Sequence, residues 1–251
     1  MSSQSTRQAA HYDRVLSEYD SHYYDPQSLA YRTRYILEPL LAGMDLNGKK
    51  VADLASGSGQ TSLYLKRRFP DIDVRGFDIS SEACRRYREV VGCPAFEVDL
   101  TTGYEGGETF DVAIVMGGLH HCVSDLPRAL ATIAGMLRPG GLLLMFEPNS
   151  DYVLEFARKL WYRLDKYFDQ QTEGALSHAA IARQAQGLFA PISLHYFGGP
   201  AFYLIYNSLI FRMPRGLKRG VSPILFGLET AFNRLPNRWL HASFLARWAK
   251  V

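Results

Sequence analysis

The stretch that decides the fold spans residues 49–60 and reads KKVADLASGSGQ. Two lysines lead into an apolar run at 51–55, the run breaks into the small residues SGSG, and a helical pattern begins near Thr61. Glycines let a backbone turn sharply and approach a ligand closely, and a helix N-terminus offers N–H groups that lack helical partners. The stretch therefore predicts a strand, a tight turn and a helix start that together hold a nucleotide-like ligand.

The acid Asp53 lies inside this strand end, just before the glycines. A carboxylate at this place would repel a phosphate and attract a cation, so we expect a ligand that carries an amine or a sulfonium. The dinucleotide fingerprint also has a third Gly or Ala three residues after the second glycine, where this chain has Ser62. An NAD-dependent oxidoreductase is therefore only a remote alternative.

The composition is that of a globular protein, with 47% hydrophobic and 21% charged residues in 251. No apolar run approaches the roughly 20 residues that span a bilayer, and the polar N-terminus shows no signal-peptide core. The three cysteines have no metal-ligand spacing, which indicates reduced thiols in a cytoplasmic protein.

The charge is unevenly distributed along the chain. Residues 1–150 hold 15 basic and 19 acidic residues, a net charge of −4, whereas residues 151–251 hold 13 basic and 6 acidic, a net charge of +7. The second part also contains 18 of the 32 aromatic residues. This suits an anionic or amphiphilic partner, or a solvated basic face over an aromatic core. Because the basic residues alternate with apolar helices, no nucleic-acid partner is expected.

Strand and helix patterns alternate through the first 150 residues. Strands are expected at 50–55, 74–77, 95–98, 110–116 and 142–146, and helices at 8–25, 27–41, 60–69, from Ser80 onward and at 125–137, ended by PGG at 139–141. The alternation predicts an α/β fold with a Rossmann-like, mostly parallel sheet and helices on both faces. Ligands bind at the carboxyl ends of such strands, which carry Asp53, Asp78, Asp99, His120, His121 and Glu147.

Over roughly residues 30–150 the chain resembles the class I S-adenosylmethionine-dependent methyltransferases. Their glycine motif, acid-x-small-x-Gly-x-Gly, is matched by DLASGSG at 53–59, with Ala55 where the family often has glycine. The later motifs are matched, in order, by GFDIS at 76–80, Asp99-Leu100, FDVAIVMGGLHH at 110–121 and LRPGGLLLMFEPN at 137–149. The resemblance implies S-adenosylmethionine as cofactor and S-adenosylhomocysteine as product.

The same resemblance implies a role for each matched residue. Asp78 would bind the ribose hydroxyls, and Asp99 would accept the adenine amine while Leu100 and Ile79 cover the ring. Arg32, or less directly Tyr24, would meet the cofactor carboxylate. The remaining cofactor contacts are assigned to Asp53, Ala55, Gly57, Gly59 and Met116.

Two histidines follow the fourth strand, where the methyl group should lie. Methyl transfer is an in-line displacement that depends on positioning, but a hydroxyl acceptor must also lose a proton to a general base. His121 is the first choice for that base and His120 the second, although either could serve only as a backbone partner. Glu147 could orient the acceptor or act as the base instead. No ligand spacing demands a metal, and none is expected.

The last hundred residues predict helices at 151–167 and 177–187 and a closing antiparallel strand pair at 192–197 and 241–251. The expected organisation is a helical cap at 1–48 lying over the ligand site, a cofactor-binding core at 49–198, a helical insertion or lid at 199–240 and a final core strand at 241–251. The insertion joins the apolar AFYLIYNSLIF to the amphipathic SPILFGLETAFNRL through a basic turn.

The apolar side of this insertion could be covered in three ways: by the rest of the protein, by a second subunit in a homodimer, or by a lipid surface. The last would use Arg212, Arg215, Lys218 and Arg219. An aromatic lid favours a small, partly apolar acceptor such as a natural product, a quinone-like ring or a lipid-linked molecule, methylated at a hydroxyl oxygen. N- or C-methylation and a non-catalytic cofactor-binding scaffold remain alternatives.

Overall fold

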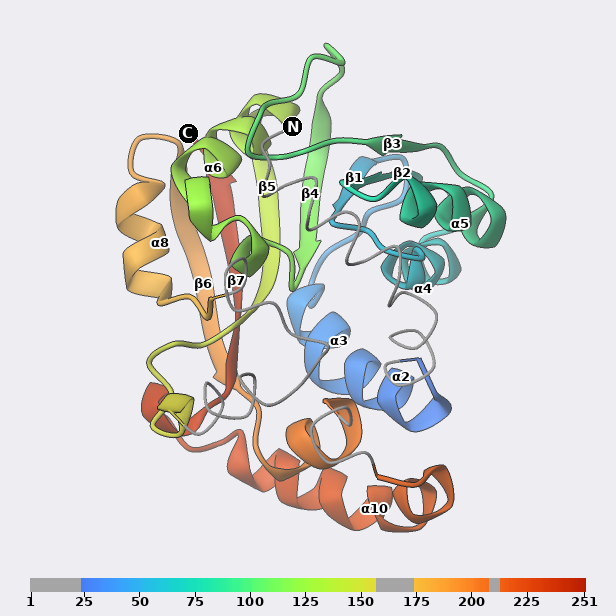
Figure 1. Ribbon diagram of the computed structural model, residues 1–251, viewed down its shortest axis with the longest axis vertical. Coiled ribbons are helices and arrows are strands. Elements are labelled where there is room, and N and C mark those ends of the chain that lie inside the picture. The colour runs from blue at the N-terminus through green and yellow to red at the C-terminus, as the bar shows by residue number, and fades with distance from the viewer. Residues whose placement is uncertain (1–23, 157–173, 208–212) are drawn as a thin grey trace.

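The computed structural model describes residues 24–156, 174–207 and 213–251. Their centre is one seven-stranded sheet in the order β3-β2-β1-β4-β5-β7-β6 (Figure 1). Only β7 runs antiparallel to its neighbours β5 and β6, which confirms the predicted fold class. The strands are β1 Lys50–Leu54, β2 Asp73–Asp78, β3 Ala95–Glu97, β4 Phe110–Met116, β5 Leu137–Pro148, β6 Phe189–Phe197 and β7 Ser243–Lys250.

Two of the helices begin at a side-chain cap. Asp25 accepts N–H groups at the start of α2 (Pro26–Arg32), and Ser80 accepts the N–H of Ala83 (3.0 Å) at the start of α5 (Ser81–Val91). A π-helical turn, η1 (Thr33–Leu37), joins α2 to α3 (Glu38–Leu40). The others are α4 Gln60–Arg68, η2 Leu119–His121, η3 Val123–Asp125, α6 Leu126–Met136, α8 His178–Gln184, η4 Phe202–Tyr206, α10 Arg215–Phe232 and η5 Arg238–Leu240.

One predicted boundary was wrong. The sequence places the end of the helix at Leu137 and the start of the fifth strand at Leu142, but β5 already begins at Leu137, which pairs with Phe110. The register shifts between Phe110 and Val112, so the PGG segment forms a bulge inside the strand. Gly140 has a φ of +70°, and a Cβ on Gly141 would lie 2.9 Å from the carbonyl oxygen of Arg138. The glycines therefore permit a bulge.

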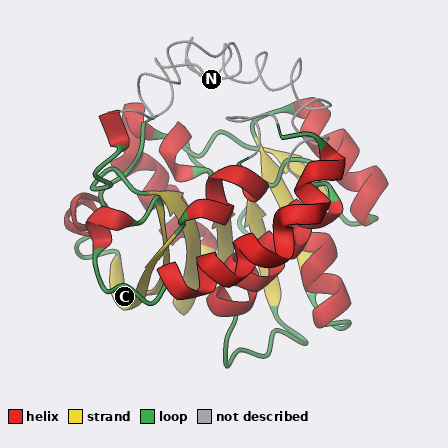
Figure 2. Cartoon of the chain, turned by 90° about the horizontal axis from the view of Figure 1, so that it is seen from below, coloured by secondary structure: helices red, strands yellow, loops and turns green. Residues whose placement is uncertain are grey.

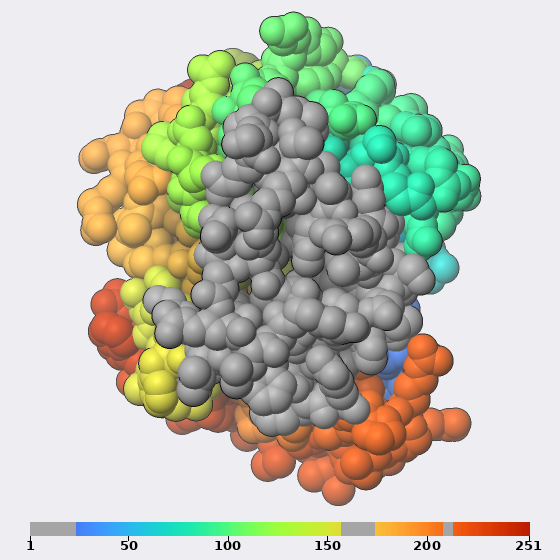
Figure 3. Space-filling model, viewed as in Figure 1, coloured from blue at the N-terminus to red at the C-terminus, as the bar shows by residue number. Residues whose placement is uncertain are grey.

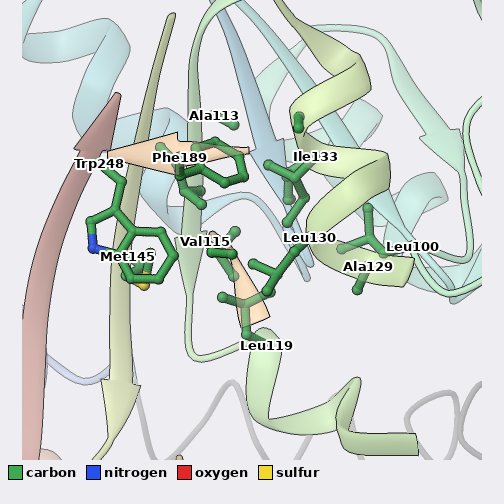
Figure 4. Close-up of a cluster of buried hydrophobic side chains, with 14 of the residues drawn as sticks. Leu100, Ala113, Val115, Leu119, Ala129, Leu130, Ile133, Met145, Phe189 and Trp248 are labelled. Atoms are coloured by element: carbon green, nitrogen blue, oxygen red, sulfur yellow. The ribbon is translucent and has the colours of Figure 1, made fainter. Parts of the chain in front are cut away.

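Each face of the sheet carries its own hydrophobic core. Successive strand residues point to opposite faces, so Val51 joins the core with α2 and α4, whereas Ala52 joins the core with α6. Figure 4 shows the second of these, in which Leu130 lies beside Val115 and Met145 lies beside Trp248. Figure 2 shows the helices on both faces of the sheet. Because helices cover both faces of the sheet, a ligand would bind at the carboxyl edge of the strands.

The N-terminal helix and the C-terminal insertion pack against each other. Lys218 of α10 forms a buried ion pair with Asp25 and donates to Ser28 (2.6 Å), while Glu229 accepts the hydroxyl of Tyr31 (2.5 Å). In Figure 1, α2 and α3 lie between the sheet and α10, which runs along the bottom of the molecule. Thus part of the insertion is covered by this chain itself.

Several predicted helices lie wholly or partly outside the described residues. These are the helix at 8–25, most of the helix at 151–167, and the second half of AFYLIYNSLIF. Within 24–156, 174–207 and 213–251, no helix is long and apolar enough to cross a membrane. The same residues contain no cluster of three side chains suited to a metal ion.

Candidate active site

Asp53 is buried at the end of β1 and is held by a chain of hydroxyl groups. Ser62 donates to the Asp53 carboxylate (2.6 Å), and Tyr87 donates to Ser62 (2.6 Å). Burial raises the pKa of Asp53 to about 7, although Ser62 and Arg32 oppose the rise. The sequence reading treated Ser62 only as a departure from a fingerprint. Its position in the first turn of α4, nine residues after Asp53, was the signal for this hydrogen bond.

Arg32 reaches the same edge from the C-terminal end of α2. Its side chain is buried and donates to Thr61 (2.5 Å), and its guanidinium carbon lies 5.7 Å from the centre of the Tyr24 ring. Its positive charge lowers the pKa of Asp53, so the two groups are within electrostatic reach of each other. A cation and an acid so placed complement the carboxylate and the ammonium of an α-amino acid group.

The glycines of the loop after β1 serve different purposes. Gly57 has a φ of +51°, and a Cβ there would meet no atom within 4 Å. Gly59 has a φ of +85°, but a Cβ there would lie 2.3 Å from Val91, so Gly59 permits α4 to pack against α5. Ala55 also adopts a left-handed backbone, with a φ of +50°, a conformation that glycine takes without a steric cost. Only Gly57 borders open space that a ligand could fill.

The ends of β2 and β3 add two further carboxylates. Asp78 accepts the backbone N–H of Gly57 (2.9 Å) and of Ser80 (2.9 Å), which ties the glycine loop to β2. One oxygen of Asp99 accepts the N–H (2.9 Å) and the hydroxyl (2.6 Å) of Thr101. The other oxygen, Oδ2, is buried and has no hydrogen-bond partner within the described residues. A buried, unpaired acceptor costs about 1–3 kcal/mol, so Asp99 is suited to a ligand that donates an N–H.

Glu147, at the end of β5, is fully buried beneath the turn after β4. One oxygen accepts the N–H groups of Gly118 (3.0 Å) and Leu119 (2.7 Å), and the other accepts the N–H of His120 (3.3 Å). The second oxygen also contacts Nδ1 of His120 at 2.9 Å. Burial raises the pKa of Glu147 to about 8, and the three backbone N–H groups oppose the rise. Glu147 is thus placed to orient His120.

The rings of His120 and His121 lie next to each other, with centres 3.9 Å apart and planes tilted by 40°. Both are partly exposed, and the backbone N–H of His121 donates to Gly118 (3.2 Å). The side chain of Met116 is partly buried at the end of β4. The Glu147 contact is made by His120, which sequence reasoning ranked second. Adjacent positions in a sequence do not show which ring a buried carboxylate reaches.

The structure brings the sequence-predicted site residues to one edge of the sheet. The ends of β1 and β2 and the loop after β3 carry one group, and α2 and the ends of β4 and β5 carry the other. The first group is Asp53, Ala55, Gly57, Gly59, Asp78, Ile79, Asp99 and Leu100; the second is Tyr24, Arg32, Met116, His120, His121 and Glu147. Sequence reasoning missed Ser62 and also Tyr206 of η4, a buried tyrosine whose pKa is raised by burial and lowered by the charge of Arg32.

Comparison with known proteins agrees with this geometry. Residues 51–141 match the family model described as a methyltransferase domain. The phthiotriol/phenolphthiotriol dimycocerosates methyltransferase of Mycobacterium leprae is 29% identical over 103 residues, 40% of this chain and 38% of that protein. The fatty-acid O-methyltransferase of Mycolicibacterium smegmatis is 28% identical over 123 residues, 47% of this chain and 44% of that protein. The matches thus span less than half of the length of these relatives.

Solved structures extend the likeness to nearly the whole chain. N-methyltransferase NodS from Bradyrhizobium japonicum WM9, in complex with S-adenosyl-L-homocysteine, superposes with a TM-score of 0.61 and covers 96% of this chain and 97% of its own. At 13% identity this likeness concerns the fold. The fold and the ordered motifs define a methyltransferase domain. Residues 51–141 are thus similar to a methyltransferase domain, and the fold of the described residues is similar to that of a methyltransferase solved with S-adenosyl-L-homocysteine.

Proposed function

We propose that this chain transfers a methyl group from S-adenosylmethionine to a hydroxyl oxygen of a small, partly apolar acceptor. The observation that carries the proposal is the contact between buried Glu147 and Nδ1 of His120. It holds one imidazole at the carboxyl edge of the sheet with its other nitrogen, Nε2, away from the carboxylate. This arrangement suits a general base.

The residues present fit the cofactor. Arg32 and Asp53 would hold the carboxylate and the ammonium of its amino acid group. The open space beside Gly57 would let the cofactor approach the backbone of the loop after β1. A carboxylate can accept two hydroxyl hydrogen bonds, and Asp78 at the end of β2 would accept those of the ribose. The unpaired Oδ2 of Asp99 would accept the exocyclic amine of adenine. When bound, the cofactor supplies an electrophilic methyl group on a sulfonium.

His120 and Glu147 would handle the proton. With Nδ1–H donated to Glu147, the lone pair of Nε2 would take the proton of the acceptor hydroxyl. The bound cofactor would supply the methyl group and leave as S-adenosylhomocysteine when its sulfur–carbon bond breaks. Above its pKa of about 8, where Glu147 is ionised, the buried carboxylate would stabilise the imidazolium. His121 remains the alternative base, but the contact with Glu147 favours His120.

The acceptor class is supported by two observations. Aromatic side chains of the insertion and of 146–152 lie together: Tyr206 packs against Phe146 within the buried core, and the half-buried Tyr203 stacks on the half-buried Tyr152 at its border. Such surfaces bind apolar groups. The relatives named for phthiotriol dimycocerosates and for fatty acids share the matched segment. We therefore propose that the acceptor is a hydroxyl-bearing lipid or a comparable small molecule.

The test compares the two histidines. Tritiated methyl transfer into a lipid extract should be detectable with the wild-type protein, and His120→Gln should lower turnover by about 10²–10⁴, the usual worth of a general base. His121→Gln is the matched control and should stay within about tenfold. Both variants should bind S-adenosylhomocysteine like the wild type in a calorimetric titration. Unchanged turnover in His120→Gln would remove the base assignment, and unlabelled lipid with intact cofactor binding would remove the acceptor class.

A further inference from the structure

The hydroxyl chain behind Asp53 has one direction in which all of its members are satisfied. The single proton of the Ser62 hydroxyl goes to Oδ2 of Asp53 (2.6 Å), so Ser62 can accept the proton of Tyr87 (2.6 Å). If Oδ2 carried a proton and donated it to Ser62, the Ser62 proton would have to turn towards Tyr87. The O–H of Tyr87, which bonds only Ser62 among the described residues, would then lose its acceptor.

Losing that acceptor is unfavourable because the chain is closed off from water. Tyr87 and Ser62 are fully buried, and Asp53 is nearly so, and a buried donor without a partner is destabilising. Burial and the charges of Asp53 and Cys93 raise the pKa of Tyr87, so its hydroxyl keeps its proton and remains a donor. Hydrogen bonds donated to a carboxylate favour its ionised form. The chain therefore favours the anionic state of Asp53.

The ring of Tyr87 is held in place by two glycines. A Cβ on Gly59 would lie 2.8 Å from Cδ2 of this ring, and a Cβ on Gly76 in β2 would lie 2.7 Å from its Cε2. Figure 1 shows α5, which carries Tyr87, beside α4 at the right of the molecule, and Figure 3 shows this region at the upper right surface. The buried ring thus points inward from a surface helix, and its hydroxyl is fixed against Ser62.

We propose that Tyr87 is a positioning residue for the cofactor: through Ser62 it keeps Asp53 as the anion that receives the cofactor's ammonium group. This role rests on the proposed function, because S-adenosylmethionine would bring that ammonium. Tyr87 itself would not touch the cofactor, since Ser62 and Asp53 lie between them. Its hydroxyl would act by raising the fraction of protein in which Asp53 is ready to bind.

The other groups around Asp53 act alongside this chain. The guanidinium of Arg32 on α2 favours the ionised form, whereas burial and the carboxylate of Asp78 at the end of β2 disfavour it. The residues that pair with Asp53 in β2 and β4, Gly76 and Ile114, carry no charge. A change at Tyr87 therefore leaves the charged neighbours of Asp53 in place and tests the hydroxyl chain alone.

The first experiment needs no ligand. The carbon-13 shift of the Asp53 carboxyl, assigned with Asp53→Asn, reports its ionisation as pH is varied. Tyr87→Phe keeps the ring and removes the hydroxyl, so the pKa of Asp53 should rise above that in the wild type. Tyr64→Phe is the matched control, because it removes a phenol hydroxyl of α4 that contacts Arg68 and lies outside the chain. Asp53 in this control should titrate as in the wild type.

The second experiment is calorimetric titration with S-adenosylhomocysteine at pH 6 and pH 8.5. At pH 6, Tyr87→Phe should raise the Kd about two- to tenfold, which is the contribution of one neutral hydrogen bond. At pH 8.5 it should bind within about twofold of the wild type, because Asp53 is then largely ionised in both proteins. Ser62→Ala should show the same pH pattern, and adding Tyr87→Phe to it should weaken binding no further.

Three results would overturn the proposal: an unchanged Asp53 titration in Tyr87→Phe, an equal rise in Tyr64→Phe, and the same ratio of Kd values at both pH values. The last result would mean that the substitution merely damages the structure. Circular dichroism checks the fold of each variant. If the Asp53 titration shifts as expected but the wild type binds no S-adenosylhomocysteine, the effect of Tyr87 on Asp53 is confirmed and the proposed function is refuted.

Discussion

At the scale of single residues, the unusual feature is an acid whose pKa lies close to physiological pH. Burial raises the pKa of Asp53 to about 7, so the ligand-free protein holds this carboxyl partly protonated. The pKa of Asp53 is therefore higher in the folded protein than its value of 3.8 in the unfolded chain. Its contribution to folding stability is complete below pH 3.8 and is lost as pH rises through about 7. A bound ammonium would lower the pKa again, because it favours the ionised form.

Cofactor affinity should therefore depend on pH through Asp53. Below pH 7 binding must release a proton from Asp53, so the Kd for S-adenosylhomocysteine should rise by up to about tenfold per pH unit. Asp53→Asn should weaken binding at pH 8 and flatten the dependence between pH 6 and 8. Calorimetric titration in two buffers of different ionisation enthalpy measures the proton release. Equal pH dependence in the two proteins would contradict the assignment.

The two glycines after β1 should respond differently to alanine. Gly57→Ala meets no atom within 4 Å and strains only a φ of +51°, so unfolding free energy should fall by about 1 kcal/mol while cofactor affinity is largely lost. Gly59→Ala places a Cβ 2.3 Å from Val91, so the fold should lose about 1–3 kcal/mol or more. Urea unfolding and cofactor titration separate the two effects. Equal cofactor affinity in Gly57→Ala and the wild type would contradict the ligand-facing role of Gly57.

At the scale of secondary-structure elements, much of the fold was predictable because local signals agreed. Three local signals each predicted an element that the structure contains: Asp25-Pro26 for α2, Ser80 for α5 and the continuous apolar run for β4. The start of β5 was missed because PGG after a helix reads as a stop, and only the pairing of Leu137 with Phe110, distant in sequence, makes it a bulge.

The candidate site was predictable to the level of elements but not of side-chain partners. Parallel strands end at one edge, so Asp53, Asp78 and Asp99 could be placed together. The selection of His120 by Glu147 depends on the orientation of the short turn η2, which the sequence does not encode in a periodic pattern. The burial of Lys218 was likewise hidden, because its partner Asp25 lies 193 residues away.

That buried ion pair should matter more than the charges around it. Lys218→Met would leave Asp25 buried without its cation, and removing one partner of such a pair costs about 3–5 kcal/mol. Arg219→Met, an exposed neighbour, is the matched control and should change unfolding free energy by less than about 0.5 kcal/mol. Urea unfolding at pH 7 measures both. A cost below that of the control would mean that water reaches Asp25.

At the scale of the whole molecule, one core joins parts that the sequence suggests as separate. Tyr31 from the N-terminal cap, Val51 and Leu144 from the sheet, and Phe202 and Ile205 from the insertion belong to the same buried cluster. The antiparallel strand β7 follows the insertion and is paired on both sides. The insertion is therefore bound into the fold at both of its ends.

Thermal unfolding should consequently be one transition. In scanning calorimetry the wild type should show a single peak whose calorimetric and van't Hoff enthalpies agree, as expected when the elements share a core. Lys218→Met should move this entire peak to lower temperature, because a looser α10 also loosens α2 and the cluster beneath it. S-adenosylhomocysteine should raise the Tm of the same peak, since it binds only the folded state. A separate early peak in Lys218→Met would show instead that the insertion unfolds on its own, and that Arg32 on α2 keeps its place without it.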